Sequence, residues 1–528
     1  MFDRNRPLAL TSFVVISALL GGCSTISGDD GETGDPIVVG TTSAPSVLDP
    51  AGAWDGSWEL FRNIYQTLMY FPNSSSSPKP DAAKSCSFTD SASKVYSCTL
   101  RKGLTFSNGH PLTSKSVKFS INRIFTIDAK AGPAGLLGSL DHIETPDERT
   151  VVFHLNKSDA TYPMVLATPA TAIVDPKVYP GDSLLKGDGI AGSGPYALAD
   201  YEDGKKAVLE KNTRYKGPAE MKNDGVTIRY FQKSDAMVKA LKHKDIDVIF
   251  RGLTPGEVND FQKAGAKGSD AVQLTEMVGT EIRYLVFNPK YKWAGNEAVR
   301  KAIAQLIDRK ALVRNVYDRT AEALYSMVPA TIIGHTNAFY DEYGEPSRAK
   351  AESILRDAGI DKKVPLTLWY TTDRYGTTMK AEFEELQRQL NGSGLFDVTI
   401  KGRPWKEFSA AYSKGEYPVF GRGWFPDFPD PDNYISPFVG ETNALGAPYV
   451  NPKLTDELLP ASRREANRAK TADEFAEAQD VIAQDARLLP LWQGKVYVAS
   501  RKDIAGIEGS LDPSTIMLMW KFHRMTSW

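Results

Sequence analysis

The chain has few cysteines and histidines and almost no net charge. Three cysteines and six histidines occur among 528 residues, and 63 basic side chains face 65 acidic ones, for a formal charge of −2. Without an excess of positive charge there is no broad field to attract nucleic acid, so we expect no nucleic-acid partner. Beyond the first 22 residues, no run approaches the roughly 20 apolar residues that cross a bilayer.

Motifs for common chemistries are also missing. There is no G-x-S-x-G elbow, P-loop or H-E-x-x-H, and the histidines are scattered; His110 lies in a turn, where a structural role is favoured. Gly187 to Gly192 matches the dinucleotide pattern G-x-G-x-x-G but runs into Ser193-Gly194-Pro195 instead of opening a helix. We expect no enzyme, cofactor or metal. A pair of carboxylates that cleaves glycosides is left open as an alternative, because the distance between the two groups depends on the fold and not on their spacing in the sequence.

The amino terminus reads as an export signal. Arg4 and Arg6 precede an apolar run, Leu8 to Leu20, that ends in Gly21-Gly22-Cys23 and is too short to span a membrane. This ending resembles the lipobox of bacterial lipoproteins, which implies removal of residues 1–22 and acylation of Cys23. A second acyl chain on the new amino terminus is needed for stable anchoring. An ordinary secretory signal with an incidental cysteine is the competing interpretation.

Residues 23–35 predict a flexible tether. Ser24 to Asp35 reads STISGDDGETGD, which has no aromatic residue and little apolar area to offset the entropy of ordering. About 490 residues remain, enough for two to four domains. Aromatic residues make up 10% of the chain, enough to line a cleft, although most aromatics fill cores.

The two remaining cysteines predict a disulfide. Cys86 and Cys98 lie in the runs SCSF and VYSCTL, on either side of a turn-like segment, Thr89 to Ser93. In an exported chain two such thiols favour a bond across a hairpin, worth about 3 kcal/mol in the chain-entropy model. Two free buried thiols are the competing interpretation, and a zinc site lacks its other ligands nearby.

The stretch LRKGLTFSNGHPLTSKSVKFSINRI, from Leu100, predicts an alternating strand, an Asn108-Gly109 turn and a helix capped by Thr113. The helix would bury a face made of Val117, Ile121, Ile124 and Phe125. The amino-acid sequence of this stretch resembles the L-R-x-G-x-x-F-x-x-G-x-P-x-T-x-x-D-V-x-F-S block of the family 5 extracellular solute-binding proteins. These proteins are the peptide-type receptors of ABC importers. Lys115-Ser116 stands where that family has an acidic pair, which changes surface charge rather than fold.

Further blocks of the same family follow in order. They are Val47 to Pro50 (L-D-P), Ile64 to Leu68 (I-Y-x-x-L), Gly192 to Tyr196 with Asn212 and Tyr215 (G-T-G-P-Y … N-x-x-Y), Phe287-Asn288 with the helix from Asn296 to Leu312, and Ser347 to Gly359. Leu366 to Tyr370 predicts a strand, and Met379, Phe383, Leu386 and Leu390 predict an amphipathic helix. Several ordered blocks are stronger support than any single motif.

Gly421 to Tyr434, GRGWFPDFPDPDNY, is the stretch of greatest functional interest. Its prolines predict a stiff, extended loop, and it resembles the family's G-W-x-x-D-x-x-D-P-x-x-F segment. In peptide-binding members the first aspartate binds the ligand's protonated amino terminus, which implies that role for Asp427. Trp424, Phe425 and Tyr434 are the candidate pocket walls. For Asp430 and Asp432 we favour Asx-turns and helix capping, and EF-hand spacing for calcium is absent.

The resemblance implies an α/β fold, the type II periplasmic-binding-protein clamshell, with two lobes, an extra domain and mixed sheets with crossovers. Lobe I would combine residues 36–77, 187–287 and 491–528; domain II would take 78–186 and lobe III 288–490. A ligand would lie between the lobes, paired through its backbone to strand edges and buried when the hinge closes.

The implied function is a lipid-anchored monomer on the extracytoplasmic face of the cytoplasmic membrane that captures peptides and delivers them to an ABC permease and its ATPases. The same fold also serves nickel complexes, haem, sugars and opines. A tethered hydrolase and a non-transport cell-envelope lipoprotein are competing functions from different classes. A basic residue for a peptide carboxylate is left open among Arg374, Arg403 and Arg422.

Overall fold

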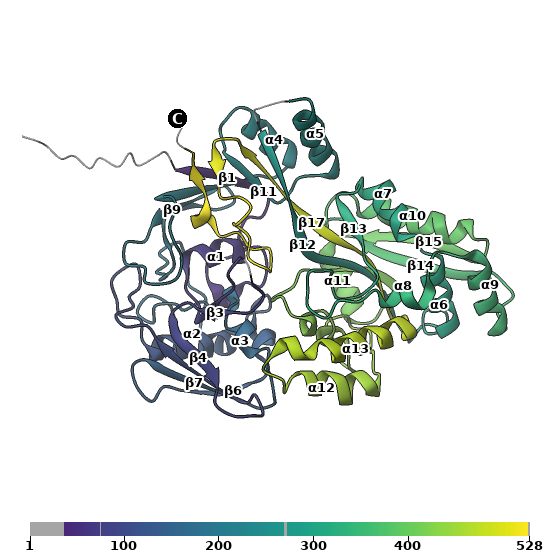
Figure 1. Cartoon of the computed structure of the whole chain (residues 1–528), viewed down its shortest axis with the longest axis horizontal. Coiled ribbons are helices and arrows are strands. Elements are labelled where there is room, and N and C mark those ends of the chain that lie inside the picture. The colour runs from purple at the N-terminus through teal and green to yellow at the C-terminus, as the bar shows by residue number, and fades with distance from the viewer. Residues whose placement is uncertain (1–35, 74, 269–271, 526–528) are drawn as a thin grey trace, which may run out of the picture. The chain divides into compact units, whose positions relative to one another are not determined.

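The structure, a computed structural model, describes residues 36–73, 75–268 and 272–525 (Figure 1). The predicted signal peptide (1–22), the tether (23–35) and Cys23 lie outside the described residues. Within the described ranges, no helix combines the length and the apolar character needed to cross a membrane. All elements below belong to the unit Pro36–Trp528.

An eleven-stranded mixed sheet is the largest element of the fold. Its order is β15-β14-β16-β12-β17-β11-β1-β10-β9-β8, and β13 pairs with β17 outside that path. Its strands are β1 (Ile37–Thr41), β8 (Tyr196–Glu202), β9 (Lys206–Lys211), β10 (Gly225–Tyr230), β11 (Val248–Phe250), β12 (Val272–Phe287), β13 (Ala321–Ala323), β14 (Val364–Thr371), β15 (Phe396–Arg403), β16 (Val419–Trp424) and β17 (Leu488–Arg501). The pairs of β14 and the pairs of β1 are parallel. Antiparallel pairs join these two groups through β12 and β17, and antiparallel pairs of β9 form the end of the sheet at β8.

The two long central strands, β12 and β17, join two hydrophobic cores. They pair antiparallel, with a register shift between Val278 and Ile282. The shift includes Gly279, where an added Cβ would lie 2.4 Å from the carbonyl oxygen of Gly494. On β12, Met277 packs against one core and Ile282 belongs to another. A side chain at this position of β12 would therefore collide with the backbone of β17 where the cores change.

A separate four-stranded antiparallel sheet has the order β4-β5-β7-β6. Its strands are β4 (Ala83–Phe88), β5 (Val95–Leu100), β6 (Leu140–Glu144) and β7 (Thr150–Leu155). Cys86 and Cys98 face each other across β4 and β5 and form the predicted disulfide. Two short pairs complete the strands, β2 (Met69–Tyr70) with β3 (Lys79–Pro80) and β18 (Ile504–Ala505) with β19 (His523–Arg524).

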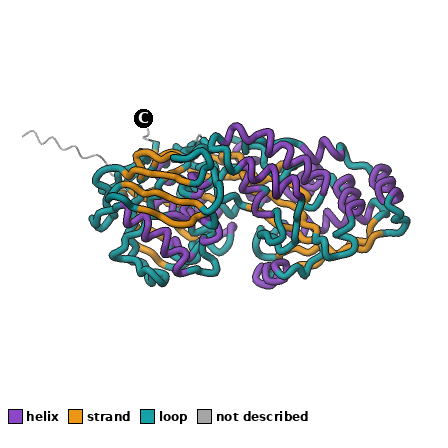
Figure 2. The backbone as a smooth tube through the Cα atoms, turned by 90° about the horizontal axis from the view of Figure 1, so that it is seen from below, coloured by secondary structure: helices purple, strands orange, loops and turns teal. Residues whose placement is uncertain are grey.

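Helices pack beside these strands, as Figure 2 shows in purple against orange. The α-helices are α1 (Trp58–Ile64), α2 (Ser114–Ile127), α3 (Tyr162–Val165), α4 (Ser234–Lys242), α5 (Pro255–Ala266), α6 (Glu297–Leu306), α7 (Arg309–Tyr317), α8 (Ala338–Tyr343), α9 (Arg348–Asp357), α10 (Met379–Gly392), α11 (Trp405–Ser413), α12 (Leu459–Ser462) and α13 (Ala472–Asp485). Local signals predicted several of these bounds. Asn296 and Ser347 cap α6 and α9 by accepting backbone N–H groups, and Gly359 after α9 has φ 71°.

One predicted strand is wrong. The segment after Leu100 leaves the sheet, and only an isolated bridge joins Thr105 to Pro111. Its backbone groups pair within the segment instead, from Phe106 N to His110 O and from Leu112 N to Leu104 O. The turn at Gly109 and the helix start after Thr113 are as predicted. The turn brings the two halves of the segment together, so their backbone groups pair with each other.

Three large hydrophobic cores organise the unit. The largest draws on residues from Ile282 to Trp492. The second combines residues within 37–65, 170–250 and 498–522, and the third lies between Ala51 and Ile173 and also includes Phe428. A buried ion pair ties segments far apart in sequence, since Arg123 Nη1 and Nη2 donate to the two Asp49 oxygens at 2.7 and 2.8 Å.

Candidate functional site

The candidate site is the loop that follows β16. Gly421 to Trp424 belong to that strand, and Pro431–Tyr434 form a 3₁₀ turn, so the expectation of an extended loop throughout is wrong. Proline fits the first turn of a helix because its missing N–H needs no partner there. Asp430 caps the turn by accepting the N–H of Asp432 at 2.9 Å, as predicted.

The Asp427 carboxylate is buried between two segments of the chain. Oδ1 accepts the Trp54 indole N–H at 2.6 Å, and Oδ2 accepts the Asn433 amide at 2.9 Å. Burial raises the pKa of the Asp427 carboxyl to about 6, although hydrogen bonds from Asn433 and Trp54 lower it. Within the described ranges, no lysine, arginine or histidine forms an ion pair with Asp427. The two described side-chain partners of Asp427 are therefore neutral.

The three predicted aromatic residues take different positions. Trp424 is half-buried, and its indole N–H donates to Asn433 Oδ1 at 3.1 Å. Phe425 is 43% exposed, the most accessible ring of the loop. Tyr434 is fully buried, and its hydroxyl donates to the carbonyl oxygen of Thr280 at 2.9 Å, so its ring supports the loop from within the core. In this arrangement Trp424 and Phe425 are the rings available to a ligand.

Arg283, on β12, is a buried charged residue beside the loop that was not predicted from the sequence. It lies opposite Gly423 and is 3% exposed. The rings of Tyr375, Trp492 and Phe425 have centroids 4.1, 5.0 and 5.4 Å from its Cζ. It pairs with Glu281, and its Nε is buried without a hydrogen-bond partner among the described residues. The sequence did offer a signal for this residue, because it lies inside the apolar run from Ile282 to Phe287 and charged residues are rarely buried unless they are paired.

The structure separates the three arginines left open by the sequence. Arg374 and Arg403 are exposed, and Arg403 pairs with Glu407 at the surface. Arg422 is buried, and its Nε and Nη1 have no hydrogen-bond partner in the described part of the chain. Its Cζ lies 4.5 Å from the Tyr412 ring centroid. Arg422 and Arg283 are therefore buried guanidiniums on β16, which leads into the loop, and on its neighbour β12.

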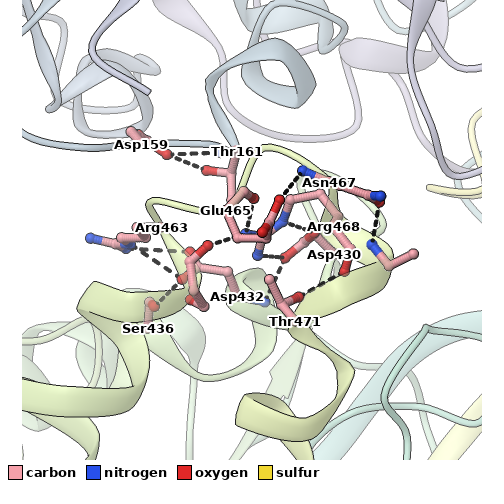
Figure 3. A network of polar contacts seen from close by, with 12 residues as sticks. Asp159, Thr161, Asp430, Asp432, Ser436, Arg463, Glu465, Asn467, Arg468 and Thr471 are labelled. Carbon is pink, nitrogen blue, oxygen red and sulfur yellow. Dashed lines mark hydrogen bonds and ion pairs between the residues drawn. The ribbon is translucent and has the colours of Figure 1, made fainter. Parts of the chain in front are cut away.

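A network of ion pairs holds the end of the loop (Figure 3). Arg468 donates to both Asp430 oxygens at 2.8 and 2.9 Å, and Arg463 contacts Asp432 at 3.3 Å. The carbonyl oxygen of Arg463 accepts the N–H of Ala160 at 2.8 Å, which links this network to the segment before α3. Asp430 and Asp432 are thus paired with arginines, whereas Asp427 has no basic partner in the described part of the chain.

This geometry suits a ligand with a cationic end. An ammonium taken out of water needs an anion nearby, and a charge-assisted hydrogen bond is stronger than a neutral one. Asp427 offers that anion, while Arg283 and Arg422 offer donors for an acidic group. His110 is used elsewhere, since its Nδ1 contacts Asp175 at 2.6 Å.

Residues 77–446 match the profile of the family described as bacterial extracellular solute-binding proteins, family 5 Middle. The chain belongs to this family. Its relatives include the "Probable D,D-dipeptide-binding periplasmic protein DdpA" of Escherichia coli, 25% identical over 89% of this chain and 91% of that protein. "Di/tripeptide-binding protein 1" of Pseudomonas aeruginosa is 24% identical over 89% of this chain and 90% of its own length.

Solved structures of solute-binding proteins share the fold. The Helicobacter pylori periplasmic binding protein DppA in complex with peptide STSA has a TM-score of 0.76 and 22% identity, covering 92% of this chain and 98% of that one. CtaP of Listeria monocytogenes has a TM-score of 0.79 and 22% identity, covering 93% and 100%. This family 5 protein therefore has the α/β fold of type II periplasmic binding proteins, as predicted, and belongs among solute receptors rather than enzymes.

Proposed function

We propose that this family 5 protein is a lipid-anchored receptor that captures short peptides between two lobes and delivers them to an ABC import permease. The observation that carries the peptide assignment is Asp427, a buried carboxylate whose two described side-chain partners are neutral. A buried charge without a counter-charge is costly, so it is retained where a ligand supplies the missing cation. A peptide's amino terminus is such a cation.

The neighbouring groups fit the rest of a peptide. Phe425 offers an exposed ring, and Trp424 lies one residue before it. Arg283 lies on the adjacent strand with its Cζ 5.4 Å from the Phe425 ring centroid, and its Nε has no partner among the described residues. We propose Arg283 as the group that binds an acidic part of the peptide, with Arg422 behind it.

We keep the predicted lobes as part of this proposal, with lobe I from 36–77, 187–287 and 491–528, domain II from 78–186, and lobe III from 288–490. The change of core along β12 supports a hinge at the register shift near Gly279, about eight residues before the predicted boundary after 287. Trp54 would then belong to lobe I and Asp427 to lobe III. A ligand that contacts both lobes would select their closed arrangement.

The relatives support the peptide assignment through their printed names, which refer to dipeptides, di/tripeptides and a bound peptide. Export and anchoring through Cys23 rest on the amino-terminal sequence. We propose that the anchored receptor acts on the extracytoplasmic face, where the permease and its ATPases would accept the ligand.

The proposal is tested by native mass spectrometry of the purified protein before and after unfolding. Release of short peptides is expected. A peptide recovered in this way is then synthesised with a free and with an acetylated amino terminus and titrated calorimetrically. Acetylation should reduce affinity at least tenfold in the wild type but leave the weaker binding of Asp427→Asn unchanged.

Exposed Asp361 provides the matched control. Asp361→Asn removes one negative charge far along the sequence from the loop and should bind both peptides as the wild type does. Equal affinity of the wild type for free and acetylated peptide contradicts the role of Asp427. A single non-peptide ligand, as in the related structure of AgaA with agropinic acid, keeps the receptor role and overturns the peptide assignment.

A further inference from the structure

A second cluster of chemistry-bearing side chains lies on the small sheet, on strands β6 and β7 at the lower left of Figure 1. His142 and His154 are a cross-strand pair, and Glu144 lies two residues along from His142. Opposed residues share a face, and so do alternate residues of a strand. Ile143 and Phe153, 3% and 0% exposed, point into the core instead. All three polar side chains therefore share the outer face.

The register shift between Leu140 and His142 produces this arrangement. A bulge adds a residue to one strand and re-aims the side chains that follow it. Here His142, rather than its neighbour Asp141, stands opposite His154. The two imidazole rings are stacked, with centroids 4.3 Å apart and planes 5° from parallel.

The potential ligand atoms converge on a small volume. Glu144 Oε1 lies 3.7 Å from His142 Nε2, and Oε2 lies 3.5 Å from His154 Nε2. One ligand atom from each residue lies within 4.8 Å of the others. Zinc binds imidazole nitrogen and carboxylate oxygen at about 2.0–2.2 Å, so ligand atoms around one tetrahedral ion lie roughly 3.3 Å apart. The cluster is thus close to the size that an ion requires.

Two further observations point to an ion. Asp141 Oδ2 lies 2.8 Å from His142 Nδ1, and an ionised carboxylate only accepts, so this contact uses a proton on Nδ1 and, in the neutral ring, leaves the Nε2 lone pair for an ion. Metal-binding histidines characteristically use such a carboxylate partner. On the other strand, His154 Nε2 is buried without a hydrogen-bond partner among the described residues.

We propose that His142, Glu144 and His154 bind a divalent transition-metal ion, of which Zn²⁺ is the probe of choice. Two imidazole nitrogens and one carboxylate oxygen are a ligand set that zinc accepts, with water in the fourth position. Lone pairs lie in the ring planes, so one stacked ring must tilt to reach the shared ion. His142, with 53% of its side chain exposed, is free to tilt. The site is independent of Asp427 and of the proposed peptide function.

The test is calorimetric titration of the chelator-treated full chain with ZnCl₂ at pH 7.5. One equivalent of zinc should bind, and His142→Ala and His154→Ala should each weaken binding at least tenfold. Asp141→Asn should weaken it by roughly 10–100-fold, as is typical when the partner of a metal-binding histidine is lost. The control is His243→Ala, which removes an exposed histidine at the end of α4 and should leave zinc binding unchanged.

X-ray absorption at the zinc edge identifies the ligands of the bound ion. Nitrogen and oxygen neighbours, with the multiple-scattering signature of two imidazoles, support the site. A sulfur neighbour would place the ion on a cysteine thiol and overturn it. Failure to take up zinc, or equal uptake by the His142 and His154 variants, also overturns it, leaving the cluster as a stacked cross-strand pair with a surface carboxylate.

Discussion

The indole N–H of Trp54 donates to Asp427 Oδ1 at 2.6 Å, across 373 residues of sequence. Trp54 is 38% exposed, whereas Asp427 is 6% exposed, so the hydrogen bond lies at the edge of a buried anion. In the proposed function the two residues belong to different lobes. The bond then both orients the carboxylate and reports on the approach of the lobes.

Replacing Trp54 by phenylalanine should weaken ligand binding without unfolding the protein. The substitution keeps an aromatic ring but removes the donor to Asp427. A hydrogen bond to a charged group contributes about 1.5–3 kcal/mol, so affinity should fall roughly 10–100-fold. Trp293→Phe, at a half-buried tryptophan that packs against the largest core, is the control. Equal calorimetric affinities for the two variants would contradict the role of Trp54.

The raised pKa of Asp427 predicts a pH-dependent stability. With a folded pKa of about 6 against an ordinary value of 3.8, the ligand-free folded state keeps a proton that the unfolded state loses between those values. The contribution of Asp427 to the free energy of unfolding should therefore fall as pH rises from about 4 through 6, by up to about 3 kcal/mol. Denaturant titrations at pH 4, 5, 6 and 7 measure it as the difference between wild type and Asp427→Asn. If the stability of the two proteins changed with pH in parallel, Asp427 would not have a raised pKa in the folded state.

Binding should show the opposite pH trend. A cationic ligand selects the ionised form of Asp427, so the affinity for a peptide with a free amino terminus should rise with pH up to about 6 and then level off. The Asp427→Asn variant should lack this rise. Affinity that is flat from pH 4 to 7 in the wild type would mean that Asp427 does not bind the cation.

Alanine substitutions at two glycines of β16 should have different effects, one on ligand binding and the other on stability. An added Cβ at Gly423 would lie 2.3 Å from Arg283 Nη1, the flexible end of a side chain, so Gly423→Ala should fold but displace the guanidinium. Peptide affinity should then fall, and less so for a peptide with an amidated carboxyl terminus. A Cβ at Gly421 would lie 2.4 Å from Cζ of the buried Phe383 ring, so Gly421→Ala should lose about 1–3 kcal/mol of stability. Unchanged affinity of Gly423→Ala for both peptides would remove Arg283 from the site.

The ion pair of Asp430 with Arg468 should be a large contributor to stability. The two side chains are 1% and 10% exposed, so Arg468→Met leaves an unpaired buried carboxylate and should cost about 3–5 kcal/mol in urea denaturation. The exposed pair of Arg348 with Glu352 is the control, and Arg348→Met should cost less than about 1 kcal/mol. The double variant with Asp430→Asn should recover part of the loss. Equal small effects of both arginine substitutions would show that the network in Figure 3 is dispensable.

Local patterns predicted much of the fold because each depends on neighbours in sequence. The cap at Ser347 and the glycine at 359 bound α9, and the apolar spacing from Met379 to Leu390 predicted α10. The segment after Leu100 was predicted wrongly, since alternation says which residues face a core but not which strand they join. Tyr434 shows the same limit, because an aromatic residue in a motif can lie in a pocket wall or behind it.

By itself, the sequence determined the family, the α/β class, the disulfide between Cys86 and Cys98, and the loop that carries Asp427. Only the tertiary structure decided that Trp54 and Asn433 hold that carboxylate and that Arg283 is buried beside Phe425. It also decided that Asp430 and Asp432 have arginine partners, whereas the described partners of Asp427 are neutral. Motifs and periodicity record constraints between residues close in the chain. Whether a buried charge has a counter-charge depends on which distant segments pack around it, and this packing is known only from the tertiary structure.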